Sequence, residues 1–284
     1  PEVSVLVETS DAKVWVSGLR GGLDVRGKRI ALDGRGLEGG ASVAVEEMLR
    51  EAGTARVVYV GEQHTSAAHH EAQLRVIRAL HAAGAQLAIG MEMFDRSYQP
   101  VLDLWSQGAL DEEEFLRRTH WYANWRFDYA LYRDILAFAR SEGIPLVALN
   151  LPFNIPPKIR VGGTDYLTEY EKGFLPVEID TTFTAHREFA QKIFGMHDFK
   201  SGVRFEDFYL AQCVWEDVMA ESLSAIIGAD RVVVLAGNGH IQYGYGIPER
   251  AFRRNGAFYR TVYQASPGEK VDPSIADYIF VASR

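Results

Sequence analysis

Four short segments of the chain are continuously apolar, and amphipathic stretches separate them. They are RVVYV (56 to 60), QLAIG (86 to 90), PLVALN (145 to 150) and RVVVLAG (231 to 237). Continuous runs of this length, rich in β-branched or small residues, are typical of strands buried on both faces of a parallel sheet. Four further segments, VWVSG, RIALDG, FYRTVYQ and DYIFVAS, predict edge or flanking strands.

Helical periodicity fills the intervals between the core strands. Thr65 or Ser66 is the expected N-cap of a helix that ends at Gly84, with Leu74, Ile77 and Leu80 on one face. Two more helices are expected between the second and third core strands, and another helical stretch from about 182 to 227. The pattern predicts one α/β domain over residues 1–284, with a mostly parallel central sheet, flanking helices and a helical cap subdomain. The helical insertions are expected at about 100–142 and 165–227.

Composition excludes several classes of function. The 284 residues are 47% hydrophobic and 24% charged, with a net charge of -8 and no basic run, which argues against a nucleic-acid surface. No segment approaches eighteen apolar residues, so no transmembrane segment is expected. Cys213 is the only cysteine, which excludes an internal disulfide, a Cys-based zinc site and covalent c-type haem attachment. The first residue is Pro1 rather than Met, so the lack of a targeting segment in this sequence is no evidence for a cytoplasmic location.

Polar residues follow three of the core strands. Glu62 and His64 come after the first, Glu92 after the second and His240 after the fourth, and each histidine stands in a G-x-x-H turn. The opening glycine of each turn is expected to make a tight or positive-φ bend. The carboxyl ends of parallel strands meet at one edge of a sheet, where ligands bind. A lone polar residue there is most often a satisfied structural group, but two matching turns and a carboxylate predict one functional site.

Neighbouring features receive different interpretations. His70 shares the apolar face of its helix and is expected to hydrogen-bond to the site from behind, whereas His69 is expected at the surface, where alanine would be nearly silent. Asp111 and Glu114 in DEEEF predict a capping box, not a metal site. GNGHIQYGYG, 237 to 246, predicts a mobile loop before a helix that starts at Pro248.

An aromatic run at 120–138 divides into two parts. Leu131, Ile135 and Phe138 form a helical core stripe. An expected loop precedes this stripe, and five of its side chains could stack on a flat ligand: His120, Trp121, Tyr122, Trp125 and Arg126.

Several of these motifs together resemble one known family. VVYVGEQHTSAAHHEAQL, AIGMEMFDRSYQPVLDLW, THWYANWRFDYALYRDILAFAR, LVALNLP and VVVLAGNGH resemble the bacterial ChaN-type haem-binding family, part of a group that includes Tiki metalloproteases and erythromycin esterases. MEMF with a following Gln and Leu is specific for the ChaN branch, whereas the wider group shares the paired turns. The resemblance implies an α/β core with a helical subdomain, noncovalent haem capture and a role in bacterial iron or haem uptake.

The resemblance also implies a lipoprotein in the periplasm or associated with the outer membrane. No lipidation cysteine is present, because Cys213 lies within an expected helix. Either that cysteine was removed with a leader or this member is not anchored, and a cytoplasmic location also stays open.

For a haem site, several residues are candidates. His64 and His240, or a tyrosine such as Tyr98, Tyr243 or Tyr245, could be the axial ligand. Glu62 and Glu92 are expected to line the site, and Arg96 or Arg126 could pair with propionates. A homodimer that shares haem is a further possibility.

An enzyme is the competing class. Glu62, His64, Glu92 and His240 could serve a zinc- or manganese-dependent hydrolase of the Tiki or erythromycin esterase type, with His64, His240 and Glu92 as metal ligands. A metal-ion binding protein without catalysis is a third possibility. The chain has no H-E-x-x-H helix and no G-x-S-x-G elbow, and whether it is an enzyme stays open.

Overall fold

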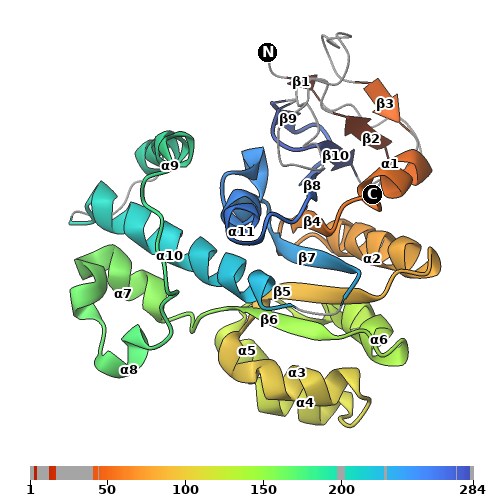
Figure 1. Ribbon diagram of the computed structural model, residues 1–284, viewed down its shortest axis with the longest axis horizontal. Coiled ribbons are helices and arrows are strands. Elements are labelled where there is room, and N and C mark those ends of the chain that lie inside the picture. Colours follow the sequence, from red (N-terminus) through yellow and green to blue (C-terminus); the bar gives the residue numbers. More distant parts are fainter. Residues whose placement is uncertain are drawn as a thin grey trace.

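The fold is built on one eight-stranded sheet (Figure 1). The computed structural model describes residues 3–4, 13–16, 41–43, 45–196, 202–226, 229–272 and 274–281. In spatial order the strands of the sheet are β3 (Ala41–Val43), β2 (Lys13–Val16), β10 (Tyr278–Val281), β8 (Tyr259–Ala265), β4 (Val57–Glu62), β7 (Arg231–Gly237), β5 (Leu87–Asp95) and β6 (Leu146–Asn150). The six strands from β10 to β6 run parallel to one another. β2 pairs antiparallel with β10, and β3 pairs antiparallel with β2. A separate pair joins β1 (Val3–Ser4) to β9 (Lys270–Val271). The predicted α/β fold with a mostly parallel sheet is confirmed.

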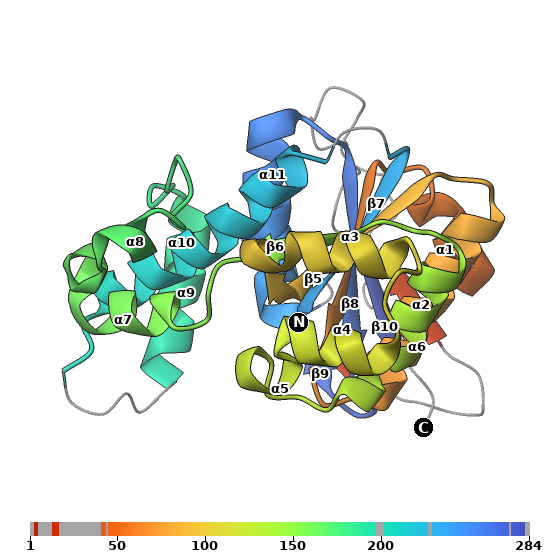
Figure 2. The same cartoon turned by 90° about the horizontal axis from the view of Figure 1, so that it is seen from below.

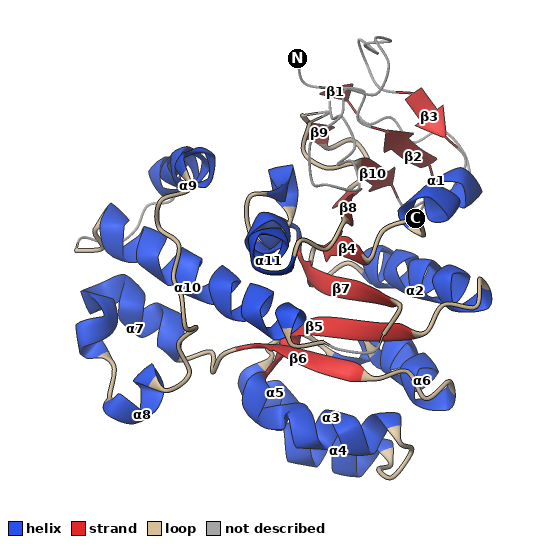
Figure 3. Ribbon diagram, in the orientation of Figure 1, coloured by secondary structure: helices blue, strands red, loops and turns tan. Residues whose placement is uncertain are grey.

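Helices cover both faces of the sheet (Figure 3). On one face Val58 and Val60 of β4 join the core formed with α1 (Val45–Ala52), α2 (Ala67–Ala82) and α6 (Arg133–Ser141). On the other face Val57 and Tyr59 join the core formed with α10 (Phe205–Ser224) and α11 (Ile247–Asn255). Because successive side chains of a strand point to opposite faces, an all-apolar strand fills both cores at once.

A helical lobe stands beside the sheet (Figure 2). It consists of α7 (Ile155–Gly162), α8 (Glu169–Lys172), α9 (Thr184–Met196) and the first half of α10. Ile155 and Ile159 of α7 pack with Val214 and Val218 of α10 in a small apolar core of their own. One long helix therefore joins the lobe to the sheet.

Three sequence-based expectations differ from the structure. Four helices, not two, lie between β5 and β6: α3 (Gln99–Ser106), α4 (Glu112–Thr119), α5 (Trp121–Asn124) and α6. β8 is paired on both sides, although FYRTVYQ predicted a flanking strand. Thr261 and Gln264 are polar but buried, so the sequence of this segment resembled that of a strand with one exposed face. β6, predicted as a core strand, lies at the end of the sheet. RIALDG lies outside the described residues.

Side chains of α3 protect the free edge of β6. Gln99 donates to the carbonyl of Leu146 at 2.9 Å and accepts the N–H of Ala148 at 2.8 Å, as a neighbouring strand would. Ser106 accepts the N–H of Leu146 at 3.1 Å. Unpaired edges invite pairing with other chains, so these contacts explain how an edge strand tolerates the apolar sequence of a core strand.

Helix ends follow the sequence closely. Ser66 is the N-cap of α2 and accepts the N–H of His69, and Gly84 beyond its end has φ +82°. Asp111 caps α4 by accepting the N–H of Glu114 at 2.8 Å. The reciprocal half of the predicted capping box is absent from the contacts described, because the Glu114 carboxylate binds two arginines of its own helix.

Candidate functional site

Strand register brings the predicted site residues to one edge of the sheet. Glu62 at the end of β4 pairs opposite Gly237 at the end of β7, and Met91 of β5 pairs opposite Leu235 of β7. Glu92 is therefore next to Gly237, whose N–H donates to Glu92 Oε2 at 2.6 Å. The prediction that these three strand ends share an edge is confirmed.

Glu62 holds the imidazole of His64. Its buried carboxylate accepts His64 Nδ1 at 2.8 Å and the hydroxyl of Tyr132 at 2.6 Å on Oε1, and Gln73 donates to Oε2 at 2.7 Å. These contacts fix the direction of the carboxylate and, through it, the orientation and tautomer of the ring. A neutral His64 would carry its proton on Nδ1.

The other nitrogen of His64 is available. Within the described residues no hydrogen-bond partner contacts Nε2, and the side chain is 28% exposed. Burial lowers the pKa of His64, but the hydrogen bond that it donates to Glu62 and the charge of Glu92 outweigh burial, so the pKa is raised from its usual value. His64 therefore presents a basic, oriented nitrogen at the strand edge.

Aromatic rings flank this imidazole. Trp125 meets the His64 ring edge-to-face with centroids 4.9 Å apart, and Phe127 lies at 4.7 Å. Trp125 is buried, and so is Trp121, which starts the short helix α5. The expectation of an exposed aromatic loop is therefore wrong for these two tryptophans, because both are needed to fill the core below α5. Tyr122 remains 64% exposed.

Two positions beside these tryptophans keep polar side chains at the surface. Arg126 is exposed, and the described part of the chain offers it no ion pair. His120 is exposed with φ 49° at the junction of α4 and α5.

His240 lies between two buried carboxylates. Its Nε2 is 3.5 Å from Glu92 Oε1, and its Nδ1 is 3.3 Å from Glu216 Oε1. Burial lowers the pKa of His240, but Glu92 and Glu216 together raise it to about 10. Burial conversely raises the pKa of Glu92, but His240 and His64 bring it down to about 2. His240 is thus an imidazolium at neutral pH, with neither nitrogen free.

The two histidines of the following helix behave differently from each other. His70 is buried, with Nε2 3.2 Å from the carbonyl of His64 and Nδ1 3.1 Å from Gln73. Its predicted place behind the site is confirmed.

His69 is also buried, and its Nδ1 accepts the N–H of Gln63 at 2.9 Å. The expected surface position of His69 is wrong, because the strand-to-helix turn folds back over that side of α2.

A cavity of about 340 Å³ adjoins His240. α9 and α10 form most of its wall, with Phe189, Phe208 and Trp215 as aromatic lining. The Trp215 ring lies 5.0 Å from that of His240. Cavities that bind small molecules start at about this size, so the His240 side of the edge offers an apolar recess as well.

Other predicted residues have partners elsewhere. Arg96 binds Glu221, Ser222 and the carbonyl of Val218 on α10. Tyr98 accepts a hydrogen bond from Asn124.

The predicted Gly-rich loop folds as two short 3-10 turns, Asn238–His240 and Gln242–Gly244. Tyr243 has φ 57° and stacks on Tyr245 with centroids 5.4 Å apart. The proline-started helix that follows is α11, as predicted.

The glycines of the paired turns serve a different purpose from the one expected. Neither has a positive φ. A Cβ on Gly61 would lie 2.0 Å from Asn238 Oδ1, and one on Gly237 would lie 3.0 Å from His64 Cε1. At this close approach of two strand ends, Gly61 leaves no space for a side chain, and Gly237 leaves space for one only if the His64 ring moves.

The geometry lends no support to a metal centre. Within the described ranges, no group of three or more His, Cys, Asp and Glu side chains could hold a metal ion. Glu62, His64, Glu92 and His240 do come together, but as two carboxylate–imidazole pairs.

Sequence reasoning missed the residues that support these pairs. Gln73 and Glu216 are buried polar groups on helices, and Tyr132 is a buried residue at the N-cap of α6. Glu216 and Asp217 stand between the apolar triplets CVW and VMA of α10, and this position was the available signal, since a buried acid needs a partner. For Tyr132 the sequence held no comparable signal.

Comparison with known proteins assigns the family. The model of a family described as haem-binding uptake, Tiki superfamily, ChaN matches residues 48–251. The chain belongs to the ChaN family. The resemblance found in the sequence motifs is confirmed. None of the curated proteins compared with the chain matches it.

Solved structures agree on the fold. ChaN of Campylobacter jejuni, described with cofacial heme binding, has a TM-score of 0.70 at 17% identity, covering 98% of this chain and 100% of that one. The type III effector HopBA1 has a TM-score of 0.49 at 13% identity, covering 83% and 91%. The erythromycin esterase EreC has a TM-score of 0.47 at 16% identity, covering 78% and 72%. The likeness to ChaN shows a shared fold, and the two weaker ones support no argument.

No helix in the described ranges has both the length and the apolar character that a membrane span requires.

Proposed function

We propose that this ChaN-family protein binds haem noncovalently at the carboxyl edge of its sheet, with His64 Nε2 as the axial ligand of the iron. One observation carries the proposal: His64 is an imidazole whose Nδ1 is held by a buried carboxylate while Nε2 has no partner in the part of the chain described. Metal-ligating histidines in proteins usually donate their second nitrogen in this way. Bound haem would supply an iron that accepts one such nitrogen.

The surroundings of His64 fit the remaining surface of a haem. Trp125 and Phe127 provide apolar ring surface against its imidazole, and a porphyrin has two large apolar faces. Arg126, between these two residues, is exposed and is the proposed partner of a propionate, through charge-assisted hydrogen bonds. Arg96 is a poorer candidate, because Glu221 already pairs with it.

His240 is assigned a supporting role. As an imidazolium between Glu92 and Glu216 it has no lone pair to offer to iron. It keeps Glu92 charged and oriented beside His64, which in turn favours a basic Nε2. The sequence treats the two G-x-x-H histidines as equivalent, whereas their hydrogen bonds favour only His64 as a ligand.

Haem titration of the full chain, followed by the Soret band, tests the assignment. His64→Ala should shift the Soret position and weaken binding, and Glu62→Gln should weaken it about 10- to 100-fold, as for other partners of ligating histidines. His81→Ala is the matched control, because His81 is a partly exposed histidine paired with Glu142 at the other end of α2. A His64→Ala spectrum identical to that of the wild type would reject His64, and a shift seen only with His240→Ala would move the haem to the 340 Å³ cavity.

The proposal for the biological role rests on the family description alone. We propose haem capture in bacterial iron or haem uptake, at a periplasmic or outer-membrane-associated site, as a lipoprotein, with a homodimer that shares haem. The family description supports uptake. Cell fractionation with an antibody tests the location, and light scattering with and without haem tests the dimer. Recovery of the protein in the cytoplasmic fraction would contradict the proposed location. A monomer at saturating haem would contradict the proposed dimer.

A further inference from the structure

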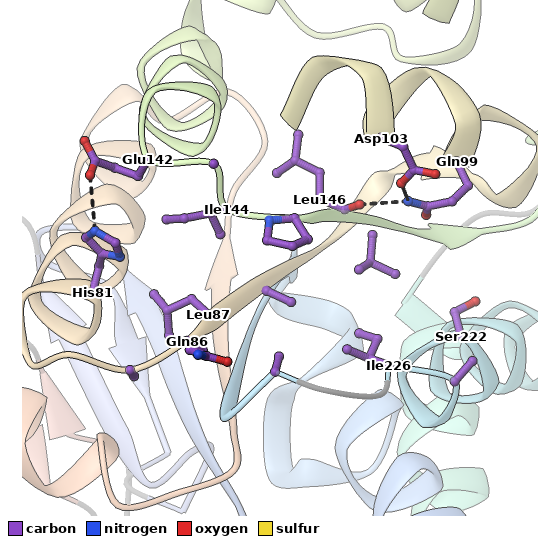
Figure 4. Close-up of a pocket in the computed structure, with 17 residues that line it drawn as sticks. His81, Gln86, Leu87, Gln99, Asp103, Glu142, Ile144, Leu146, Ser222 and Ile226 are labelled. Carbon is purple, nitrogen blue, oxygen red and sulfur yellow. Dashed lines mark hydrogen bonds and ion pairs between the residues drawn. The ribbon is translucent and has the colours of Figure 1, made fainter. Parts of the chain in front are cut away.

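A second cavity, of about 740 Å³, lies at the opposite edge of the sheet (Figure 4). It is bounded by the starts of β5 and β6, by the ends of α2 and α10, and by α3. Its size falls within the range of small-molecule sites. Neither the family assignment nor the proposed haem site accounts for it.

The wall of this cavity is aliphatic. Leu87, Ala88, Ile144 and Leu146 are buried side chains that form its floor. Further alanines, a valine, a proline and Ile226 continue the wall, and no phenylalanine, tyrosine or tryptophan is among the described lining residues. Such a surface packs well against a flexible alkyl chain, and the imidazole of His81 at one end is the only ring among these residues.

The charged side chains of the lining are predominantly acidic. Its titratable residues are His81, Asp103 and Glu142, and no lysine or arginine is among the described lining residues. Glu142 already pairs with His81 at 3.2 Å. Asp103 Oδ1 accepts from Gln99 at 2.8 Å, and no cation in the described ranges pairs with this carboxylate. Figure 4 shows Asp103 at the end of the cavity opposite His81 and Glu142.

We propose that this cavity binds a primary aliphatic amine, with its ammonium group on Asp103 and its alkyl chain along the floor of β5 and β6. Gln99 orients the carboxylate, because its amide is fixed to the edge of β6. A fatty acid or another anionic amphiphile would meet the Asp103 carboxylate, which no cation in the described ranges neutralises. Burial of the alkyl chain supplies most of the affinity, and Asp103 selects the charge of the head group.

Titration calorimetry of the full chain with n-decylammonium below its micelle concentration, beside decanoate, tests the proposal. The amine should bind saturably and at least tenfold more tightly than the acid. Asp103 is exposed, so Asp103→Asn, which keeps the bond from Gln99, should weaken binding of the amine only about three- to fivefold, the size of a solvent-exposed ion pair, without weakening decanoate. Asp165→Asn, an exposed aspartate on the helical lobe, is the matched control and should change nothing.

A second variant tests the cavity itself. Ala225→Trp places a large ring in the opening from an exposed position at the end of α10, so the fold should persist. It should reduce decylammonium binding more than tenfold and leave haem titration unchanged. Equal binding of decanoate and the amine, or unchanged amine binding in Ala225→Trp, would overturn the proposal. Because haem is measured separately, failure here is distinct from failure of the haem assignment.

Discussion

The main-chain N–H of Gly237 donates a 2.6 Å hydrogen bond to Oε2 of Glu92. The other oxygen of the same carboxylate lies 3.5 Å from Nε2 of His240. The buried Glu92 side chain of β5 therefore contacts both Gly237, at the end of β7, and the imidazolium of His240, three residues further along the chain. His64, the proposed ligand, also lies beside Gly237. The charge of His240 therefore acts on His64 through the Glu92 carboxylate, which raises the pKa of His64.

Stability should fall at alkaline pH through His240. Its pKa is about 10 in the folded protein and about 6.5 in the unfolded chain. Between these values the folded state binds one proton more, so this stabilisation is complete below about 6.5 and is lost as pH rises toward 10, by up to about 1.4 kcal/mol per pH unit. Urea unfolding from pH 6.5 to 9.5 measures the slope.

The matched variant is His240→Gln, which cannot titrate. It should be less stable than the wild type at pH 7 and should lose the alkaline slope. A wild-type slope retained in His240→Gln would assign the effect to another group.

His69 should control stability on the acid side. Burial lowers its pKa to about 4, so the folded state resists protonation that the unfolded chain accepts near 6.5. The stabilisation is present above about 6.5 and is lost as pH falls toward 4, by on the order of 2 to 3 kcal/mol. His69→Asn keeps an acceptor for the Gln63 N–H but cannot titrate. Its free energy of unfolding should therefore change less with pH between about 6.5 and 4.

His69→Ala should also cost about 1 to 3 kcal/mol at pH 7, because it leaves the Gln63 N–H without its acceptor. His81→Ala removes a partly exposed histidine, serves as the comparison and should cost far less. Equal stability of the two alanine variants would restore the surface position that the sequence suggested for His69.

Features that depend on local sequence were predictable, whereas those that depend on contacts between distant segments were not. Strand ends were predictable, because a continuous apolar run followed by glycine and polar residues depends only on local order. Tyr132 was not, because it meets Glu62 across 70 positions and nothing local marks its hydroxyl for burial. His69 and Gln264 were misread for a related reason: each is a polar residue buried by distant elements that satisfy it.

Arg250 should be the most sensitive arginine of α11. It is 1% exposed and binds Glu216 at 3.3 Å and Asp217 at 2.5 Å. Arg250→Met removes the buried guanidinium that these two carboxylates share, which should cost about 3 to 5 kcal/mol. Arg253→Met on the same helix removes only a partly exposed guanidinium and should cost below about 1 kcal/mol. Chemical denaturation compares them, and similar losses would contradict the role given to burial.

A single methyl group beside His64 tests whether Nε2 is the working atom. In Gly237→Ala the new Cβ would lie 3.0 Å from Cε1 and 3.2 Å from Nε2 of His64, so the ring must move by a few tenths of an ångström. The backbone there, with φ -55°, accepts alanine without strain. Haem affinity should therefore fall about tenfold, in line with the cost of disturbing a ligand's surroundings, while the protein stays folded. Gly239→Ala lies in the same turn with open space around its Cβ and should bind haem as the wild type does. Soret titration and far-UV circular dichroism of both variants decide the matter, and an unchanged Soret titration in folded Gly237→Ala would place the iron away from His64 Nε2.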